Sequence, residues 1–595
     1  FKGAIVPLFL LSLFGMKVLF LIFIVVMPLI GNTQINFFSS AYDSLKSDYR
    51  IGGSMHNLDQ STQLFDASFL LLNGRSSYLS LSALNPNGAK IHSFGKSKRV
   101  KLISPLPHIG FSYFFGTQGA QKLGFEYQQV FKGDWVLNTA ISNIKSGGFF
   151  RNTSFGHTDL DFSLSKKKED YGISLKGRTS KVSREWSGGV VDASLLESFD
   201  PLLVPVNKSS CTSVLKYFET DLLAYVNLVK REDYTIGVMH EVRVDGENRV
   251  FTEQDTLNGL YSNLYFDSLN TRDQYQHSRL INTSLAYFKN SSLSYSAGAS
   301  VVYWNYRNMN LYRDTLELDL VQQLEFSKGK FDWIHNSKLN TIGASRSWYF
   351  NNQLRYRAGE ITVQFKSELG QKLPEVYQRF YSANNIFYSN TDLELQTYSK
   401  QALELVFKKP KYTVTPGYVL QTNRGVYFYN LTQLNWSNES TLSSNLTQQV
   451  YLKSIFKHKS FRWRQVYRLS LTNTERLIVP LHQLEGSLMA SAGLFKAKKL
   501  RATFGLTYHL NSKTSIIPLI ENMGQYHLLE VSTSDTQKGL FNLGAMVAME
   551  IETFRFFVKL SNIGYLWNST SWQYIDGIYL PESTVRVGLT WDFWN

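Results

Sequence analysis

The chain has 595 residues, with 62 Lys and Arg against 47 Asp and Glu, a net charge of +15 and a single cysteine. One cysteine excludes an internal disulfide framework and a thiolate zinc site, and basic residues scattered along the chain argue against a nucleic-acid partner. Aromatic residues reach 14%, Pro is scarce at 13 residues and mean hydropathy is −0.20, a combination that favours many half-polar strands over several soluble domains.

The N-terminus carries a long apolar run that is interrupted by Lys17. Met16 and Lys17 open a short basic region, an apolar stretch follows, and small or polar residues lead to Gln34. This layout predicts a cleaved signal peptide over residues 16–33, with residues 1–15 as upstream non-native sequence. The alternative is a transmembrane helix, which would place Lys17 near the bilayer centre at a cost of about 2.5–3.5 kcal/mol.

A short N-terminal periplasmic segment is expected over residues 34–65, and an outer-membrane β-barrel over residues 66–595. In the second region the dominant period is two. Leu123, Phe125 and Tyr127, for example, alternate with small or polar residues, which places them on one face of a strand. The alternating segments predict about 22 such strands, in a range of about 18 to 26. We expect an even number, because single-chain bacterial barrels have even numbers of strands.

The connections between the predicted strands alternate in length. Residues 230–233, 358–360 and 408–411 are short and polar, whereas residues 186–212 and 511–538 are long. Short periplasmic turns and long external loops are typical of membrane barrels. A water-soluble all-β protein is the alternative, but the chain has no repeat of fixed length, and its polar strand faces cannot form a dry core. The predicted fold class is therefore an all-β, transmembrane, antiparallel β-barrel.

The C-terminal segment alternates most regularly. Its apolar face consists of Val585, Val587, Leu589, Trp591 and Phe593. Five apolar residues on an unprotected edge strand would invite aggregation in a soluble protein. A terminal strand that ends in aromatic residues instead resembles the assembly signal of outer-membrane barrels, which implies the barrel-assembly machinery as a partner.

Three blocks of the chain resemble a known family, the putative porins, which are large single-chain outer-membrane barrels of Gram-negative bacteria. The blocks are residues 104–152, which begin SPLPHIGFSYFFG, residues 379–400, which read RFYSANNIFYSNTDLELQTYSK, and a C-terminal pair, FRFFVKLSNI at 554–563 and YLPESTVRVGLTWDFWN at 579–595. The resemblance implies an integral protein of the cell outer membrane, in contact with outer-membrane lipids and lipopolysaccharide. The family has no catalytic motif to transfer.

The sequence contains only fragments of known catalytic and nucleotide-binding motifs. HSFGKS at residues 92–97 lacks the first glycine of a phosphate loop, and His240-Glu241 lacks the second histidine of a zinc protease motif. No GxSxG surrounds a serine nucleophile. We therefore expect no enzyme activity, no cofactor and no metal, and we expect Cys211 to be an ordinary loop residue.

Charged residues opposite the apolar faces are expected to line the lumen, because Lys or Arg on the lipid face costs about 2–4 kcal/mol at the midplane. The predicted lining residues are Glu126, Asp159, Asp161, Lys176, Arg355, Arg357, Arg462, Arg464, Arg468, Arg555, Lys559 and Arg586. A net-basic lining would favour anions. The alternative is that these charges pair with one another and only brace the wall.

The sequence therefore predicts a porin that lets small hydrophilic solutes diffuse passively through a water-filled lumen. The alternative is a barrel like a TonB-dependent receptor, or one associated with secretion, that binds a protein partner. Only about 30 residues separate Gln34 from the first strand pattern, too few for a plug domain of typical size. The sequence leaves open whether the barrel forms a homo-oligomer.

Overall fold

The computed structural model describes residues 106–594 with short gaps. The gaps are residues 255–260, 262, 344–345, 375, 431–432, 439–443, 475–479, 496–498, 517–518, 527–535, 568–571, 576 and 580–581. The expected signal peptide, the expected periplasmic segment and residues 66–105 of the expected barrel domain lie outside the described residues.

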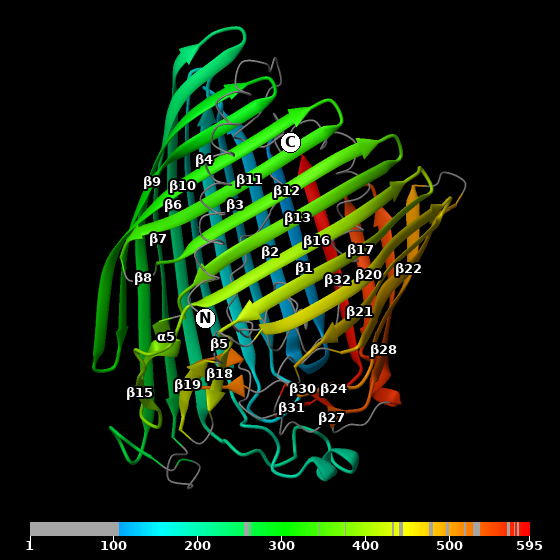
Figure 1. Cartoon of the computed structure of the whole chain (residues 1–595). Helices are drawn as coiled ribbons and strands as arrows, with labels where there is room; N and C mark the ends of the chain where they lie inside the picture. Colours follow the sequence, from blue (N-terminus) through cyan, green and yellow to red (C-terminus); the bar gives the residue numbers. More distant parts are fainter. Residues whose placement is uncertain are drawn as a thin grey trace.

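The described residues form a closed antiparallel barrel of 22 strands (Figure 1). It closes because β1 (His108–Gly116) pairs with β32 (Thr584–Trp594), so that His108 faces Trp594 and Gly116 faces Arg586. Closure leaves no free sheet edge. The predicted fold class and strand number are confirmed.

The remaining barrel strands follow one another in chain order, each antiparallel to the next. The first group is β2 (Ala120–Phe131), β3 (Trp135–Ser146), β4 (Phe155–Lys167), β5 (Tyr171–Glu185), β6 (Cys211–Lys230), β7 (Tyr234–Glu253), β8 (Thr271–Asn290), β9 (Leu293–Asn308), β10 (Leu311–Lys328) and β11 (Phe331–Ile342). The second group is β12 (Trp348–Ala358), β13 (Ile361–Lys372), β16 (Gln396–Lys408), β17 (Tyr412–Arg424), β20 (Ser444–His458), β21 (Phe461–Thr472), β22 (His482–Leu494), β23 (Leu500–Asn511), β28 (Leu540–Ile551) and β29 (Phe554–Ser561).

The two ends of the barrel differ. At the turn end, which is uppermost in Figure 1, short turns such as residues 132–134 join the strands. At the loop end, longer connections carry small elements of their own. These elements are η2 (Thr117–Gly119), η3 (Ala193–Glu197), α5 (Val376–Arg379), β14 (Phe380–Ser382), β15 (Phe387–Ser389), β18 (Tyr427–Asn430), β19 (Asn435–Asn438), β24 (Thr514–Ser515), β25 (Leu519–Ile520), β26 (Gln525–Tyr526), β27 (Thr536–Gln537), η5 (Ile563–Leu566), β30 (Gln573–Ile575) and β31 (Ile578–Tyr579). None of the helices in the described part of the chain has the length and apolarity that crossing a bilayer requires.

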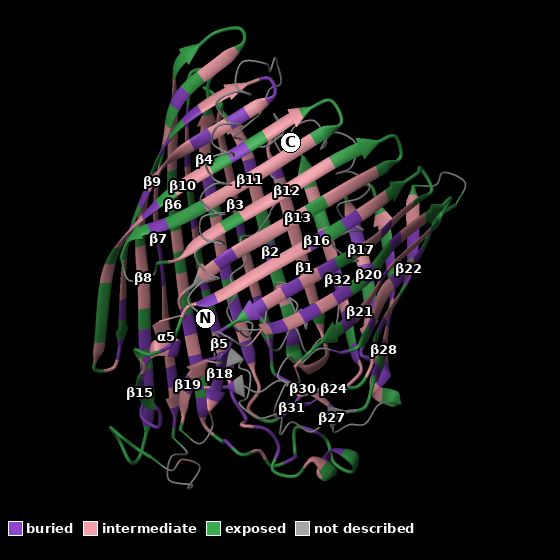
Figure 2. Ribbon diagram, viewed as in Figure 1, coloured by how far each residue is buried: buried purple, intermediate pink, exposed green. Residues whose placement is uncertain are grey.

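Side chains along each strand alternate between two environments. On β7, Ile236, Val238 and Val244 are exposed, whereas Asp245 and Arg249 on the opposite face are buried. Curvature spreads side chains on the outside of a closed barrel and crowds those on the inside, so the buried polar face is the inward one. Figure 2 shows exposed residues at the short turns and buried residues gathered around β15, β18 and β19. The wall is thus apolar towards a bilayer and polar towards the lumen.

Several glycines in the wall lie under a tyrosine ring from the neighbouring strand. Gly417 faces Tyr451 across the β17–β20 ladder, and a Cβ at this glycine would lie 2.2 Å from the ring. The same arrangement recurs at Gly172–Tyr225, Gly237–Tyr287, Gly370–Tyr398 and Gly486–Tyr508. Such aromatic cover compensates for the missing side chain and helps to fix strand register.

Candidate functional site

The strand register places every predicted lining residue on the inward face. These residues lie on β2 (Glu126), β4 (Asp159, Asp161), β5 (Lys176), β12 (Arg355, Arg357), β21 (Arg462, Arg464, Arg468), β29 (Arg555, Lys559) and β32 (Arg586). Each one faces an inward residue of a neighbouring strand, as Lys559 faces Arg586. Their part in conduction stays a prediction.

Several of these charges are held in ion pairs between neighbouring strands. Arg178 Nε on β5 lies 3.0 Å from Asp159 Oδ1 and 3.7 Å from Asp161 Oδ1 on β4. Lys176 Nζ lies 3.7 Å from Asp221 Oδ2 on β6. These contacts cross-link β4, β5 and β6, so this sector of the wall is braced by its own charges.

Similar ion pairs join strands later in the chain. The Asp332 carboxylate on β11 accepts a hydrogen bond from Arg357 Nη2 and lies 3.7 Å from Arg355 Nη1. Arg468 Nη2 donates to Glu485 Oε1 at 2.8 Å. Arg555 likewise pairs with Glu550 on β28 at 3.0 Å. Charges neutralised in this way contribute little net field to the lumen.

Arg462 differs from these residues. It faces Lys457 across the β20–β21 ladder, and like charges in directly opposed positions repel each other. Arg462 contacts no acidic side chain in the described part of the chain, and its Nε is buried without a hydrogen-bond partner. The pair therefore leaves positive charge on the inward wall that the described residues do not neutralise.

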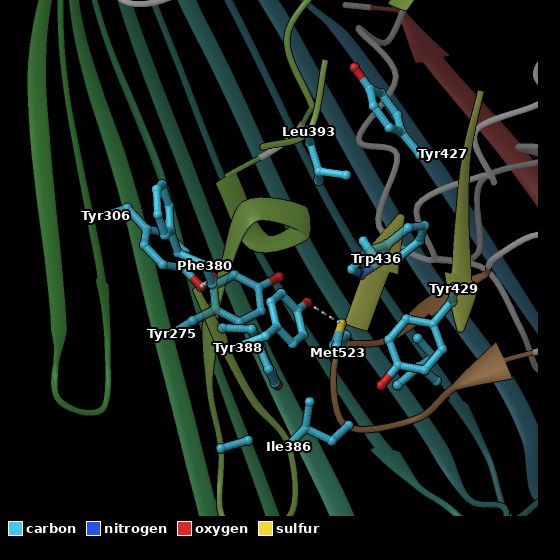
Figure 3. Packing of buried hydrophobic residues seen from close by; sticks show 13 residues of the cluster. Tyr275, Tyr306, Phe380, Ile386, Tyr388, Leu393, Tyr427, Tyr429, Trp436 and Met523 are labelled. Carbon is cyan, nitrogen blue, oxygen red and sulfur yellow. Dashed lines mark hydrogen bonds between the residues drawn. The ribbon is translucent and has the colours of Figure 1, made fainter. Parts of the chain in front are cut away.

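Aromatic side chains from several connections pack together inside the loop end (Figure 3). Tyr275 on β8 and Tyr306 on β9 supply the wall side of this cluster, because both point inward. Tyr306 Oη donates to the carbonyl oxygen of Phe380 at 3.2 Å, and Tyr388 Oη lies 3.6 Å from Met523 Sδ. Contact with inward wall residues places the β14–β15 hairpin within the mouth of the barrel.

Asn384, in the turn of that hairpin, ties it to the connection between β7 and β8. Its backbone N–H donates to Asp273 Oδ1 at 2.7 Å, and its Nδ2 donates to the carbonyl oxygen of Asp267 at 2.7 Å and to Thr271 Oγ1 at 3.0 Å. Its Oδ1 accepts from the backbone N–H groups of Phe266 and Asp267, both at 2.9 Å. One buried side chain thus satisfies polar groups of the β7–β8 connection and of the first residue of β8.

Lys208, in the connection between β5 and β6, joins three parts of the loop end. Its Nζ donates to Glu521 Oε2 at 2.7 Å and to Tyr261 Oη at 2.9 Å, and it lies 3.5 Å from Glu253 Oε1. Burial acts to lower the pKa of Lys208, but the neighbouring Glu521 and Glu253 carboxylates outweigh burial and raise the pKa above its usual value. Lys208 therefore stays charged and binds the connection that carries Glu521.

Arg249 anchors the same connection from the wall. Its guanidinium group donates to the carbonyl oxygen of Asn522, and its Nη2 donates to that of Glu521 at 2.6 Å. Arg249 is 1% exposed, and a buried charge is costly unless hydrogen bonds compensate it. The connection between β23 and β28 is consequently docked onto the inner side of β7.

A second apolar cluster lies at the loop end. Its buried members are Phe149, Phe150, Val190, Leu196, Val204 and Tyr579. They come from the connections between β3 and β4, β5 and β6, and β29 and β32. In the same region Gly189 and Gly577 approach so closely that a Cβ on Gly577 would lie 3.1 Å from the Cα of Gly189. Both clusters are thus built from connections far apart in the sequence.

The sequence signalled few of these loop contacts. The block at residues 379–400 shows only a family resemblance, and Lys208, Arg249 and Glu521 belong to no sequence pattern that predicts a contact. The expectation that Cys211 lies in a loop is wrong. Cys211 is the first residue of β6, where it is buried and faces Glu253 of β7. Within the described residues, no group of three or more His, Cys, Asp or Glu could hold a metal ion.

A comparison with known protein families assigns this chain to one of them. The family model described as putative porin matches residues 103–595. The chain belongs to the putative porin family. The resemblance of the three sequence blocks is thereby confirmed, and a search of curated proteins finds no match.

Solved structures share the fold of this porin-family chain at low identity. The siderophore receptor PirA from Acinetobacter baumannii has a TM-score of 0.59 and 11% identity, over 83% of this chain and 81% of that chain. The copper transporter OprC has a TM-score of 0.61 and 9% identity, over 83% and 81%. The FrpB iron transporter from Neisseria meningitidis has a TM-score of 0.59 and 9% identity, over 82% and 83%. These values establish a common barrel architecture.

Proposed function

We propose that this porin-family barrel is an integral protein of the cell outer membrane that passes small hydrophilic solutes, with a preference for anions. The observation that carries the preference is the Lys457–Arg462 pair, two inward-facing cations that no acidic side chain neutralises among the described residues. Fixed positive charge on a pore wall lowers the energy of anions relative to cations in the lumen. Membership of the putative porin family supports the solute-passing role.

The docked connections at the loop end favour a narrow entrance to the lumen. The β14–β15 hairpin packs against Tyr275 and Tyr306 inside the mouth, and Arg249 holds a further connection there. A constriction of this kind admits small solutes and excludes larger ones, because passage requires a path between docked loops. We propose that the lumen itself performs no catalysis and serves only for passage.

The surfaces imply further partners. The exposed apolar outer face is suited to outer-membrane lipids and lipopolysaccharide. We also propose that the terminal strand β32 is recognised by the barrel-assembly machinery through its outward apolar residues.

A second candidate function is a receptor-like barrel that releases its loops only when a ligand or a protein partner binds. The interlocked loop end favours it, and so does the likeness in fold to a siderophore receptor and to metal transporters. In that case the resting barrel would be closed to ions.

Conductance of the refolded full chain in planar bilayers separates the two candidates. The channel candidate predicts stable ion-conducting steps. Folding of the barrel is checked by its heat-modifiable mobility on a gel. A correctly folded barrel that does not conduct contradicts the open channel and favours the receptor-like candidate.

A further inference from the structure

A hollow of about 340 Å³ opens at the turn end of the barrel, where hairpin β16–β17 meets hairpin β20–β21. Its lining includes Lys408, Lys409, Thr413, Ile455 and Lys457. A volume of this size lies in the range of small-ligand sites. The charged groups of its lining are all basic.

The strand register brings these cations together on the inward face. Lys408 faces Thr413, Thr413 faces Ile455, and Lys457 faces Arg462. Three strands, β16, β20 and β21, thus contribute Lys408, Lys457 and Arg462 to one patch beside the hollow. Like charges this close repel one another unless a counter-charge lies between them.

The nearest acidic groups are already engaged. Glu404 on β16 accepts from Lys366 Nζ at 3.2 Å and from Lys453 Nζ at 3.0 Å. Glu360 lies in the β12–β13 turn, 3.4 Å from Lys409 Nζ, with its side chain 60% exposed. In the part of the chain that the structure describes, neither carboxylate pairs with Lys408, Lys457 or Arg462, and Arg462 Nε is buried without a hydrogen-bond partner.

We infer that this hollow, together with Arg462 beside it, binds small anions that carry two or more phosphate or carboxylate groups. We call the hollow and Arg462 the basic pocket. Such an anion supplies the missing counter-charge, and the Arg462 guanidinium group offers the paired donors that suit phosphate and carboxylate. The inference rests on the proposed anion pathway and deepens it, because the pocket would hold the solute at the turn end of the lumen. A lipid phosphate is the other source of the same chemistry.

Calorimetric titration of inorganic pyrophosphate into the full-length barrel in neutral detergent micelles tests the pocket. Saturable binding is expected, and Lys457→Gln should weaken it about tenfold, as expected for the loss of a charged hydrogen bond. Lys408→Gln provides an independent second variant with the same expected direction. The matched control is Lys330→Gln, an exposed lysine in the β10–β11 turn at the same end of the barrel, which should bind pyrophosphate as the wild type does.

Absence of saturable binding, or an equal loss in Lys330→Gln, contradicts the pocket. A second arm adds phosphatidylglycerol to the micelles. Unchanged pyrophosphate affinity supports a solute site, whereas displacement of pyrophosphate by the lipid overturns it in favour of a headgroup site. A barrel that conducts anions selectively without binding pyrophosphate refutes the pocket alone, and a barrel that binds pyrophosphate without conducting refutes the channel alone.

Discussion

Lys208 Nζ lies 2.7 Å from Glu521 Oε2, although 313 positions in the sequence separate these two residues. The pair is largely sheltered, with side-chain exposures of 11% and 17%. It connects the loop after β5 to the loop after β23, on opposite halves of the chain. The loop end of the barrel therefore behaves as one joined assembly whose stability depends on a few buried polar contacts.

Replacing Lys208 with Gln should loosen the connection that contains Glu521. Removal of one partner of a sheltered ion pair leaves the other uncompensated, at a cost of up to roughly 3–5 kcal/mol. We expect faster hydrogen exchange and earlier proteolysis at residues 519–526, with the barrel strands unchanged. Lys168→Gln is the control, because its pair with Asp134 is exposed at 43% and 66%, and exposed ion pairs contribute little to stability. Similar exchange in the two variants would show that Lys208 does not hold the loop.

Gly577→Ala should separate the loop after β29 from the loop after β5. Gly577 has a φ of +74° and lies against Gly189, so alanine adds a backbone clash to the strain of a left-handed conformation. Gly133→Ala is the matched control, because Gly133 has a φ of +84° and nothing within 4 Å of its Cβ position. Backbone strain alone costs about 1 kcal/mol, so the thermal midpoint should fall further for Gly577→Ala. Equal midpoints would contradict the close approach.

Gly417→Ala should destabilise the wall by displacing the ring of Tyr451. Tyr451 Oη donates to Glu404, which also holds two lysines, so a shift of the ring disturbs a shared carboxylate. Overpacking of this type costs about 1–3 kcal/mol. Gly110→Ala on β1 serves as the control, since its Cβ would meet only atoms at 3.5 Å. Urea unfolding of both variants in detergent measures the difference, and an equal loss would argue against the tyrosine cover.

Trp591→Ser combined with Phe593→Ser should impair assembly into the membrane. The rings of Trp591 and Phe593 contact each other in a tilted arrangement with centroids 4.2 Å apart, and the Trp591 ring meets that of Phe554 edge-on at 5.7 Å on the outer face. We expect a several-fold lower amount of folded protein in the membrane fraction of cells, with refolding in detergent preserved. Phe504→Ser on β23, another exposed outward aromatic residue, controls for loss of apolar surface. An equal loss in the control would remove the special role of the terminal strand.

The barrel wall could be predicted from the sequence because the pattern that specifies each strand lies within a few consecutive residues. Alternation of apolar and polar residues fixes which way each side chain points, so residues such as Arg462 and Arg586 could be assigned to the inner face without knowing their neighbours. The same reasoning could not tell Arg462 from Arg468. Whether a charge in the lumen is neutralised depends on the neighbouring strands. Arg462 faces Lys457 on β20, whereas Arg468 pairs with Glu485 on β22.

The loop end could not be predicted in this way. Asn384 and Lys208 act through contacts with connections that are far away in the sequence, and no period or motif encodes such contacts. Burial of Tyr275 and Tyr306 likewise depends on loops folding back into the mouth, which their strand pattern does not reveal. The strand assignment of Cys211 is hidden for a related reason, since β6 begins at Cys211 because that residue pairs with Glu253 on β7, which is far away in the sequence.

The reversal potential of the channel under a potassium chloride gradient tests the central claim most directly. We expect an anion-selective wild type, a shift towards cations in Arg462→Glu, and little shift in the double variant Arg468→Gln/Glu485→Gln, because the double variant removes an ion pair that has no net charge. A wild-type channel that prefers cations, or selectivity that is unchanged in Arg462→Glu, would contradict the claim that unneutralised basic residues on the inner wall select the solute.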